Sequence, residues 1–150
     1  CRGNNSLLLD ETKRSLNDAL LVVRCLYQQP FLIPGGGAPE IELSTKLTTW
    51  ARTLSGVDQL CVKEFAKCLE ALPYTLAENC GLNPMELVTQ LRNAHAAGDM
   101  HVGLDIKKGD VTDLVKINIV QPLLVSNSAL RLSAETVSAI LKVDDILMSR

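Results

Sequence analysis

The stretch Pro34-Gly35-Gly36-Gly37-Ala38-Pro39-Glu40 separates two helical patterns, and the organisation of the chain follows from it. Three consecutive glycines present no side chains for packing, so they permit either a tight backbone path or the close approach of a ligand. Taken alone, the triplet is weak evidence for a binding loop and favours a turn. Pro39 suits the first turn of a helix, because its missing N–H would be unpaired there anyway.

Amphipathic helical patterns flank this stretch on both sides. Apolar residues at helical spacing, with charges at the start, predict a helix over 10–28. This helix ends before Pro30, because proline disfavours helical geometry in the residue that precedes it. After the glycines, the same spacing predicts a helix over 39–55, with Gly56 as its C-terminal stop.

The next helical segments are expected to be short and separated by prolines and glycines. The apolar spacing predicts two helices, over 58–71 and over 73–81. The stretch Asn83-Pro84-Met85-Glu86 predicts a further helix start, with its Asn as N-cap and its Glu completing a capping box. This helix is expected to stop at Gly98.

The helical pattern breaks near residue 100. Residues 100–106 alternate apolar and polar side chains, as a strand does, and a turn follows them. Residues 114–120 are ambiguous, a long helix is expected after Pro122, and residues 143–148 are compatible with a terminal strand. The predicted fold is therefore mainly helical, with a few short strands and no internal repeat.

Composition narrows the class of protein. The 150 residues are 47% hydrophobic and 21% charged, which is close to the average of globular proteins and argues against a disordered chain. No apolar run approaches the ~18 residues of a membrane span. A net charge of −2 and an aromatic content of 3% give no case for binding nucleic acid or an anionic membrane. The chain begins with Cys1 rather than Met, which suggests an excised segment.

The five cysteines are odd in number and form no C-x-x-C pair. The sequence therefore predicts a reducing compartment, and neither a zinc ribbon nor a thioredoxin-like motif. Cys25, Cys61 and Cys68 fall among apolar residues at helical spacing and are expected to be small core residues. His95 and His101 lie at no metal-ligand spacing from a cysteine or a carboxylate, so no metal site is expected.

Generic catalytic motifs are absent from the sequence. It contains no Walker phosphate loop, dinucleotide-binding fingerprint, nucleophile-elbow serine or zinc-protease helix motif. A single carboxylate on a helix, such as Asp18, is usually a solvated surface residue, although Asp18 lies beside the apolar stripe rather than opposite it. On these patterns alone, the chain is a helical domain of unassigned function.

Several stretches, in order along nearly the whole chain, resemble the group II chaperonins, the ATP-driven protein-folding rings of archaea and the eukaryotic cytosol. The stretches are Asp10-Glu11, Arg14-Ser15-Leu16-Asn17-Asp18-Ala19-Leu20, Gly35-Gly36-Gly37-Ala38-Pro39-Glu40, Leu76-Ala77-Glu78-Asn79-Cys80-Gly81-Leu82-Asn83-Pro84 and Ile140-Leu141-Lys142-Val143-Asp144-Asp145-Ile146. Two more are most similar to the delta class of subunits in the eukaryotic complex: Arg52-Thr53-Leu54-Ser55-Gly56 and Val120-Gln121-Pro122-Leu123-Leu124-Val125-Ser126. Each stretch is weak evidence alone, but together they are specific.

The resemblance implies a domain organisation and a set of partners. In this family an equatorial domain binds ATP and makes most ring contacts, an apical domain binds the client, and an intermediate domain connects the two. Residues 1–32 would be the second segment of the intermediate domain, and residues 33–150 the second segment of the equatorial domain. The implied partners are other chaperonin subunits in a double ring and unfolded protein clients. The implied location is cytoplasmic, with no nucleic acid and no membrane partner.

The resemblance also assigns roles to seven positions, with ATP or ADP and Mg²⁺ as the implied cofactor. Asp18 matches the aspartate that activates the attacking water; a carboxylate suits this role because it orients water and accepts its proton late. Gly35 and Gly36 match glycines whose backbone packs against the nucleoside, and Leu104-Asp105-Ile106 matches the strand segment along adenine. Gln121 stands where most relatives have an acidic residue that hydrogen-bonds the ribose; it can still donate and accept, but it carries no charge.

The family's phosphate-binding loop, a Gly-Asp-Gly-Thr-Thr type of sequence, does not occur in these 150 residues. The nearby aspartate that helps to hold magnesium does not occur either. Because neutralising phosphate charge is most of phosphoryl-transfer catalysis, we expect these residues alone to be inactive toward ATP, with the Mg²⁺ ligands mostly outside them. A helical interaction fragment with no chemistry of its own is the alternative interpretation.

Overall fold

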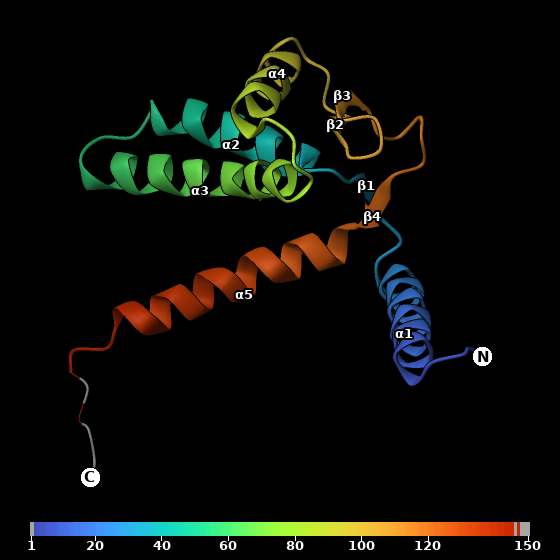
Figure 1. The fold of residues 1–150 in the computed structure, drawn as a ribbon. Helices are drawn as coiled ribbons and strands as arrows, with labels where there is room; N and C mark the ends of the chain where they lie inside the picture. The colour runs from blue at the N-terminus through green and yellow to red at the C-terminus, as the bar shows by residue number, and fades with distance from the viewer. Residues whose placement is uncertain (1, 146, 148–150) are drawn as a thin grey trace. The chain divides into compact units, whose positions relative to one another are not determined.

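The computed structural model describes residues 2–145 and 147, and in this part of the chain it is mainly helical, as predicted (Figure 1). Two expectations concern residues outside the described ones: the chain start at Cys1, and the part of the terminal strand at Ile146 and Met148. The described residues 143–145 form no strand.

Helices make up most of the described chain, and short strands lie between them along the sequence. The helices are α1 (Ser6–Gln28), α2 (Ala38–Ala51), α3 (Val57–Asn79), α4 (Pro84–Ala96) and α5 (Leu123–Leu141). The strands are β1 (Leu32–Pro34), β2 (Val102–Asp105), β3 (Asp110–Asp113) and β4 (Val120–Pro122). Strand β1 pairs with β4, and β2 pairs with β3 in an antiparallel hairpin whose register places Val102 opposite Asp113 and Asp105 opposite Asp110.

The chain divides into two compact units. One, which we call the core unit, comprises Ile33–Gln121; the other, the two-helix unit, comprises Cys1–Leu32 with Pro122–Arg150. The assignment of residues 1–32 to an intermediate domain and of residues 33–150 to an equatorial domain stays a prediction.

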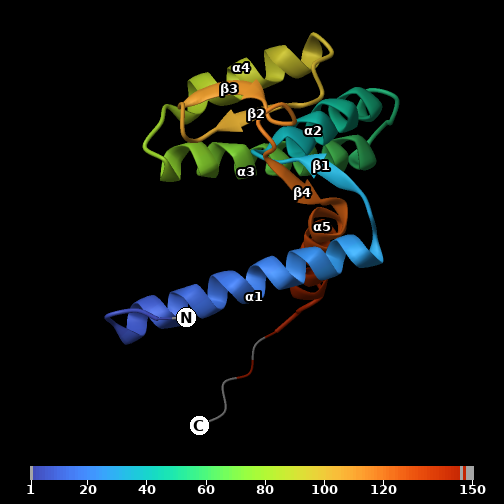
Figure 2. The same cartoon turned by 90° about the vertical axis from the view of Figure 1, so that its right-hand side faces the viewer.

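The core unit packs α2, α3 and α4 with the β2–β3 hairpin (Figure 2). One apolar cluster joins Ile41 of α2 to Val88 and Leu91 of α4, with Val102 and Val111 of the hairpin against it. A second cluster joins α3, α4 and β2; its buried members are Ala77, Leu87 and Leu104. The hairpin is therefore held on the helices by burial of its inward apolar side chains.

Helix α3 is continuous, so the prediction of two separate helices over 58–71 and 73–81 is wrong. Pro73 lies inside the helix and removes one backbone donor, yet its side chain is among the most deeply buried in the described chain. A Cβ added to Gly37 would lie 2.6 Å from the Cβ of Pro73, so the proline occupies space that only a glycine leaves open. Tertiary packing against the glycine triplet thus outweighs the local cost of the proline.

Glycine ends two of the helices where the sequence predicted it. After α3, Gly81 N–H donates to Glu78 O at 2.9 Å and Leu82 N–H donates to Ala77 O at 3.0 Å. These two bonds form a Schellman motif, which requires the left-handed conformation that Gly81 adopts at φ 72°. Gly98 ends α4 in the same way, with φ 105°.

Two details of the predicted helix ends are wrong. Helix α2 ends at Ala51 rather than near residue 55, because the following amides bond three residues back, and Gly56 instead immediately precedes α3 as its N-cap. Asn83 stands at the N-cap of α4, but its side chain makes no capping hydrogen bond, so the expected capping box does not form.

The cysteines expected in the core lie outside it. Cys61 and Cys68 are exposed and Cys25 is half-buried. The buried residues of α3 are instead Ala66, Leu69, Pro73 and Ala77, and both of its exposed cysteines fall off that stripe.

In the two-helix unit, α1 begins at Ser6, earlier than predicted, because the side chain of Asn5 accepts a hydrogen bond from Leu7 N–H at 3.3 Å. Neither α1 nor α5 contains a buried residue. Their apolar stripes therefore lie open, with Leu20 70% and Ile140 65% exposed. No described helix is both long enough and apolar enough to cross a membrane.

Candidate functional site

The glycine loop that precedes α2 makes close contact with its own chain. Gly35 N–H donates to Ile119 O at 3.1 Å, and Gly36 O accepts from Leu104 N–H at 2.9 Å. Gly36 has φ 58°, and a Cβ there would lie 2.5 Å from a methyl carbon of Leu114 and 2.7 Å from Leu104 O. The close approach that requires glycine at this position is thus, in the described chain, an approach to strand β2.

The segment Leu104-Asp105-Ile106 presents three different environments. Leu104 is buried in the core and Asp105 is buried beside it, whereas Ile106 is 50% exposed. The Asp105 carboxylate accepts from Lys107 N–H at 3.0 Å and Lys108 N–H at 3.4 Å, so it holds the hairpin turn. The Leu104 N–H bonds Gly36 O and the Asp105 carbonyl accepts from Gly109 N–H at 2.8 Å, so the side chain of Ile106 is the exposed part of this segment.

Gln121 is half-buried in β4, the strand that pairs with β1 just before the glycine loop. Because Gly35 bonds Ile119 and Gly36 bonds Leu104, three segments far apart in the sequence meet at this loop. We call this place the glycine corner; it comprises Gly35, Gly36, residues 104–106 and residues 119–121. Six of the seven predicted site positions belong to it.

Asp18, the seventh position, lies on α1 in the two-helix unit and is exposed. The described chain shows no hydrogen bond or ion pair of its carboxylate. The two units are not placed relative to each other, so Asp18 and the glycine corner are two separate halves of the predicted site.

The sequence did not predict a polar pair formed by the buried His95 and the half-buried Glu42. His95 of α4 lies with Nδ1 2.8 Å from Glu42 Oε2 of α2 and Nε2 2.8 Å from Val102 O of β2. The hydrogen bond from His95, together with Lys46, holds the pKa of Glu42 below its ordinary value. The only local signal was a histidine in the apolar stripe of its helix, and the sequence contains nothing that pairs it with a residue 53 positions away.

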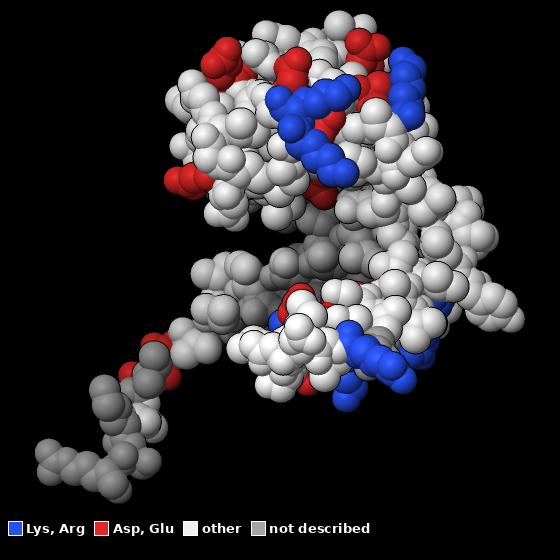
Figure 3. Space-filling model, turned by 45° about the vertical axis from the view of Figure 1, so that its right-hand side comes forward, with Lys and Arg blue, Asp and Glu red and all other residues white. Residues whose placement is uncertain are grey.

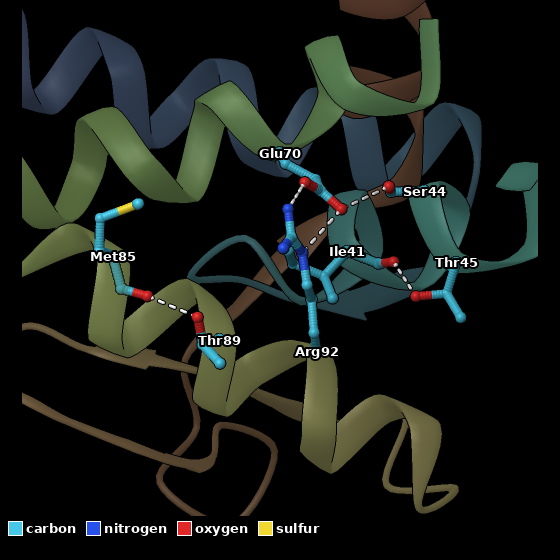
Figure 4. A network of polar contacts seen from close by, with 7 residues as sticks. All are labelled: Ile41, Ser44, Thr45, Glu70, Met85, Thr89 and Arg92. Carbon is cyan, nitrogen blue, oxygen red and sulfur yellow. Dashed lines mark hydrogen bonds and ion pairs between the residues drawn. The ribbon is translucent and has the colours of Figure 1, made fainter. Parts of the chain in front are cut away.

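A second polar network ties the three helices together (Figure 4). Ser44 of α2 donates to Glu70 Oε1 of α3 at 2.8 Å, and Arg92 Nε of α4 donates to the same oxygen at 3.1 Å, with a second Arg92 nitrogen on Glu70 Oε2. This network borders a groove of about 430 Å³ between the helices, which includes Arg52 and Lys63 among its lining residues. None of the predicted site residues lines it.

The charged and metal-ligating side chains of the described residues form no additional candidate site. On the face shown in Figure 3, acidic and basic side chains lie among wide uncharged areas. No group of three or more His, Cys, Asp or Glu side chains in the described part of the chain is arranged to hold a metal ion.

The glycine corner combines groups that differ in chemistry and in exposure. Gly35 is buried, Gly36 and the amide residue Gln121 are half-buried, and Ile106 presents an exposed apolar side chain. These groups suit a flat base and a ribose hydroxyl. The seven predicted positions include no Lys or Arg, so nothing in the set neutralises phosphate.

Comparison with known proteins shows which family the chain belongs to. The family model described as the TCP-1/cpn60 chaperonin family matches residues 1–150. The chain is 58% identical over 149 residues to the T-complex protein 1 subunit delta of Arabidopsis thaliana and 52% identical over 149 residues to that of Homo sapiens. Both alignments cover 99% of this chain but 28% of the relative, so the chain spans little more than a quarter of their length.

A solved structure of a group II chaperonin has a similar fold. The open-state monomer of a group II chaperonin from Methanococcoides burtonii matches with a TM-score of 0.80 and 36% identity, covering 94% of this chain and 35% of that chain. The predicted resemblance to group II chaperonins, and to their delta class in particular, is confirmed. The chain belongs to the TCP-1/cpn60 chaperonin family.

Proposed function

We propose that this chain forms part of a subunit of an ATP-dependent protein-folding chaperonin in the cytoplasm, where ATP binding and hydrolysis drive ring closure around unfolded clients. Family membership across all 150 residues supports the proposal. The other subunits of a double ring are its partners, and the client-binding domain lies outside this chain. In this proposal residues 1–32 belong to the intermediate domain and residues 33–150 to the equatorial domain.

One observation carries the nucleotide part of the proposal. The 2.9 Å hydrogen bond from Leu104 N–H to Gly36 O joins two segments that the family resemblance assigns independently to the nucleoside. In this proposal the loop at Gly35 and Gly36 lies along the nucleoside, Ile106 contacts the base, and Gln121 hydrogen-bonds the ribose. The uncharged Gln121 supplies one or two neutral hydrogen bonds there, in place of a charge-assisted one.

Asp18 acts in the proposal as the group that orients the attacking water. Its exposed carboxylate is uncommitted in the described chain, so it is free to accept a hydrogen bond from water and, late in the reaction, a proton. Bound Mg²⁺ neutralises the phosphates, and the ligands for it are mostly outside this chain. Asp18 and the glycine corner belong to different units, and in this proposal hydrolysis occurs only when Asp18 is beside the bound nucleotide.

The test uses a full-length subunit that carries this sequence. Asp18→Ala is expected to lower ATP hydrolysis by about 10²–10⁴-fold, the range of a lost general base, and to leave the dissociation constant of MgADP unchanged. Glu135→Ala, which removes an exposed acid of α5, is the control and should hydrolyse ATP at the parent rate. Hydrolysis at the parent rate in Asp18→Ala would refute the role of Asp18, and a parent that binds no nucleotide would refute the function.

A helical interaction fragment is the second candidate, and the open apolar stripes of α1 and α5 favour it. An ATP titration of the 150 residues alone, beside one of the full-length subunit, separates the two. We expect binding by the full-length subunit and no magnesium-dependent turnover by the chain alone. If neither the 150 residues nor the full-length subunit binds ATP, the interaction fragment is the better interpretation.

A further inference from the structure

The side chain of His95 connects three elements of the core unit. It extends from α4 and is 0% exposed, with Glu42 of α2 at one ring nitrogen and the Val102 carbonyl of β2 at the other, each at 2.8 Å. A buried polar side chain is costly unless its hydrogen bonds are made, and in this pair both nitrogens have a partner.

The partners determine which nitrogens carry hydrogen. A carbonyl oxygen only accepts, so Nε2 donates to Val102. Nδ1 faces a carboxylate that Lys46 also contacts, with Nζ 3.0 Å from Glu42 Oε1, and this pairing keeps Glu42 ionised. Both ring nitrogens therefore face oxygen atoms that accept hydrogen bonds. Glu42 and Lys46 are the charged groups that the described chain places at this histidine.

The hydrogen bond from His95 to Val102 lies close to the glycine corner. Val102 is two residues before Leu104, whose N–H bonds Gly36 O, and a Cβ on the intervening Gly103 would lie 2.9 Å from Gly35 O. Apolar burial of Val102 is non-directional and does not set where the strand lies along its own axis. The bond from His95 is directional, and it holds a carbonyl of the same short strand.

We propose that His95 and Glu42 are a positioning pair that holds strand β2 against the glycine loop and thereby sets the geometry of the nucleoside side of the site. This inference rests on the proposed function for its nucleotide part. The anchoring of the strand is independent of it, because the hydrogen bonds exist without any ligand.

The chain offers a matched control for this pair. Ser44 is also a buried polar residue of α2, with 2% of its surface exposed, and its bond to Glu70 joins α2 to α3 without touching the hairpin. Ser44→Ala therefore removes a buried hydrogen bond from the same helix layer and leaves β2 anchored.

The experiment uses the full-length subunit with His95→Leu, Glu42→Gln and Ser44→Ala. Hydrogen exchange of the 100–113 peptide and the dissociation constant of MgADP are measured for each. His95→Leu is expected to speed exchange in this peptide and to weaken MgADP binding, each by about tenfold, because the hydrogen bond that holds Val102 is lost. Glu42→Gln should stay within about threefold of the parent, because its amide N–H donates to a neutral Nδ1 while Nε2 still donates to Val102.

The experiment has distinct results that would overturn the inference. The inference is overturned if His95→Leu leaves exchange and affinity unchanged, or if Ser44→Ala or Glu42→Gln changes both as much as His95→Leu does. Faster exchange with unchanged affinity also overturns the positioning role. If His95→Leu does not fold, Glu42→Ala replaces it, with both readouts expected to move in the same direction. A parent that binds no MgADP overturns the proposed function and the positioning role, while exchange still decides whether the pair anchors the strand.

Discussion

Gly36 shows how much a single position depends on its surroundings. Its φ of 58° is a conformation that L side chains rarely adopt, and the space where a Cβ would lie is filled by Leu114 and Leu104. Gly98 has a similar backbone requirement, at φ 105°, but open space around it. Substitutions at the two glycines therefore distinguish the free-energy cost of the backbone conformation from that of steric overlap with neighbouring residues.

Gly36→Ala is expected to lower the free energy of unfolding by about 2–5 kcal/mol, as the sum of a left-handed alanine and an overpacked contact. Gly98→Ala, the control, should cost only the first part, about 1–2 kcal/mol. Urea unfolding followed by the fluorescence of Trp50, the single tryptophan, reports on the core unit. Equal losses in the two variants would contradict the packing argument.

Two carboxylates of α2 are shifted in opposite directions. Burial raises the pKa of Glu40, whose Oε2 is buried without a partner in the described chain, whereas His95 lowers the pKa of Glu42. A lowered folded pKa stabilises the protein above the ordinary value of 4.5 and loses this contribution as pH falls through the folded value. A raised pKa does the reverse, because its folded form binds the proton more tightly than the unfolded chain.

Stability against urea, measured from pH 7 down to about pH 3, should therefore separate Glu42→Gln from Glu40→Gln. Glu42→Gln is expected to be less stable than the parent at pH 7 and to approach it as the pH falls. Glu40→Gln should be at least as stable as the parent at pH 7, because it removes a poorly solvated charge. Parallel profiles for all three proteins would show that neither carboxylate is coupled to folding in this way.

At the scale of elements, the helices of the two units differ in what they bury. Helix α4 has four buried residues, including Leu91 at 1% exposure, and it contacts α2, α3 and both hairpin strands. Helix α5 is longer but has no buried residue. The free energy that holds the described core therefore comes mainly from α2, α3, α4 and the hairpin.

Leu91→Ala is expected to lower the free energy of unfolding by about 2–5 kcal/mol, the usual cost of a cavity in a packed core. Leu132→Ala in α5, where the side chain is 61% exposed, should change it by less than about 0.5 kcal/mol. Both are measured by urea unfolding with Trp50 fluorescence. A small loss in Leu91→Ala would mean that the core unit is loosely packed around α4.

At the scale of the whole molecule, the chain leaves large apolar side chains open on α1 and α5. Those exposed by half or more include Leu7, Leu8, Leu16, Leu20, Val23, Tyr27, Leu132, Val137, Ile140 and Leu141. Exposed apolar surface of this extent usually marks an interface. The chain spans 28% of the length of the delta subunit of Arabidopsis thaliana, and in the proposed function other parts of a subunit would cover these faces.

The 150 residues alone are therefore expected to dimerise or aggregate. Light scattering over rising concentration should show a growing mean mass, and Leu20→Lys, which places a charge on the α1 stripe, should lower it. Glu135→Lys on the exposed part of α5 is the charge control and should leave the mass near that of the parent. A monomer at high concentration would contradict the expectation.

The helices that the sequence predicted correctly depend on local rules. Apolar spacing predicted α1, α2, α4 and α5, and the glycine stops at Gly81 and Gly98 follow from backbone sterics within a few residues. The predicted helix break at Pro73 was wrong because this proline packs into the space left by Gly37, which is 36 positions earlier in the sequence. Rules that use only neighbouring residues cannot include such a contact.

For the candidate site too, the sequence identified residues but not their tertiary contacts. Sequence resemblance selected Gly36, Leu104 and Asp105, but it could not show that Leu104 faces the core or that Asp105 holds its own turn. The pairing of His95 with Glu42 left no trace in the sequence, since buried hydrogen bonds between distant residues depend on which elements pack together. Periodicity and glycine placement are properties of neighbouring residues and can be read along the chain, whereas the partner of a buried polar group is set by long-range packing and exists only in the folded molecule.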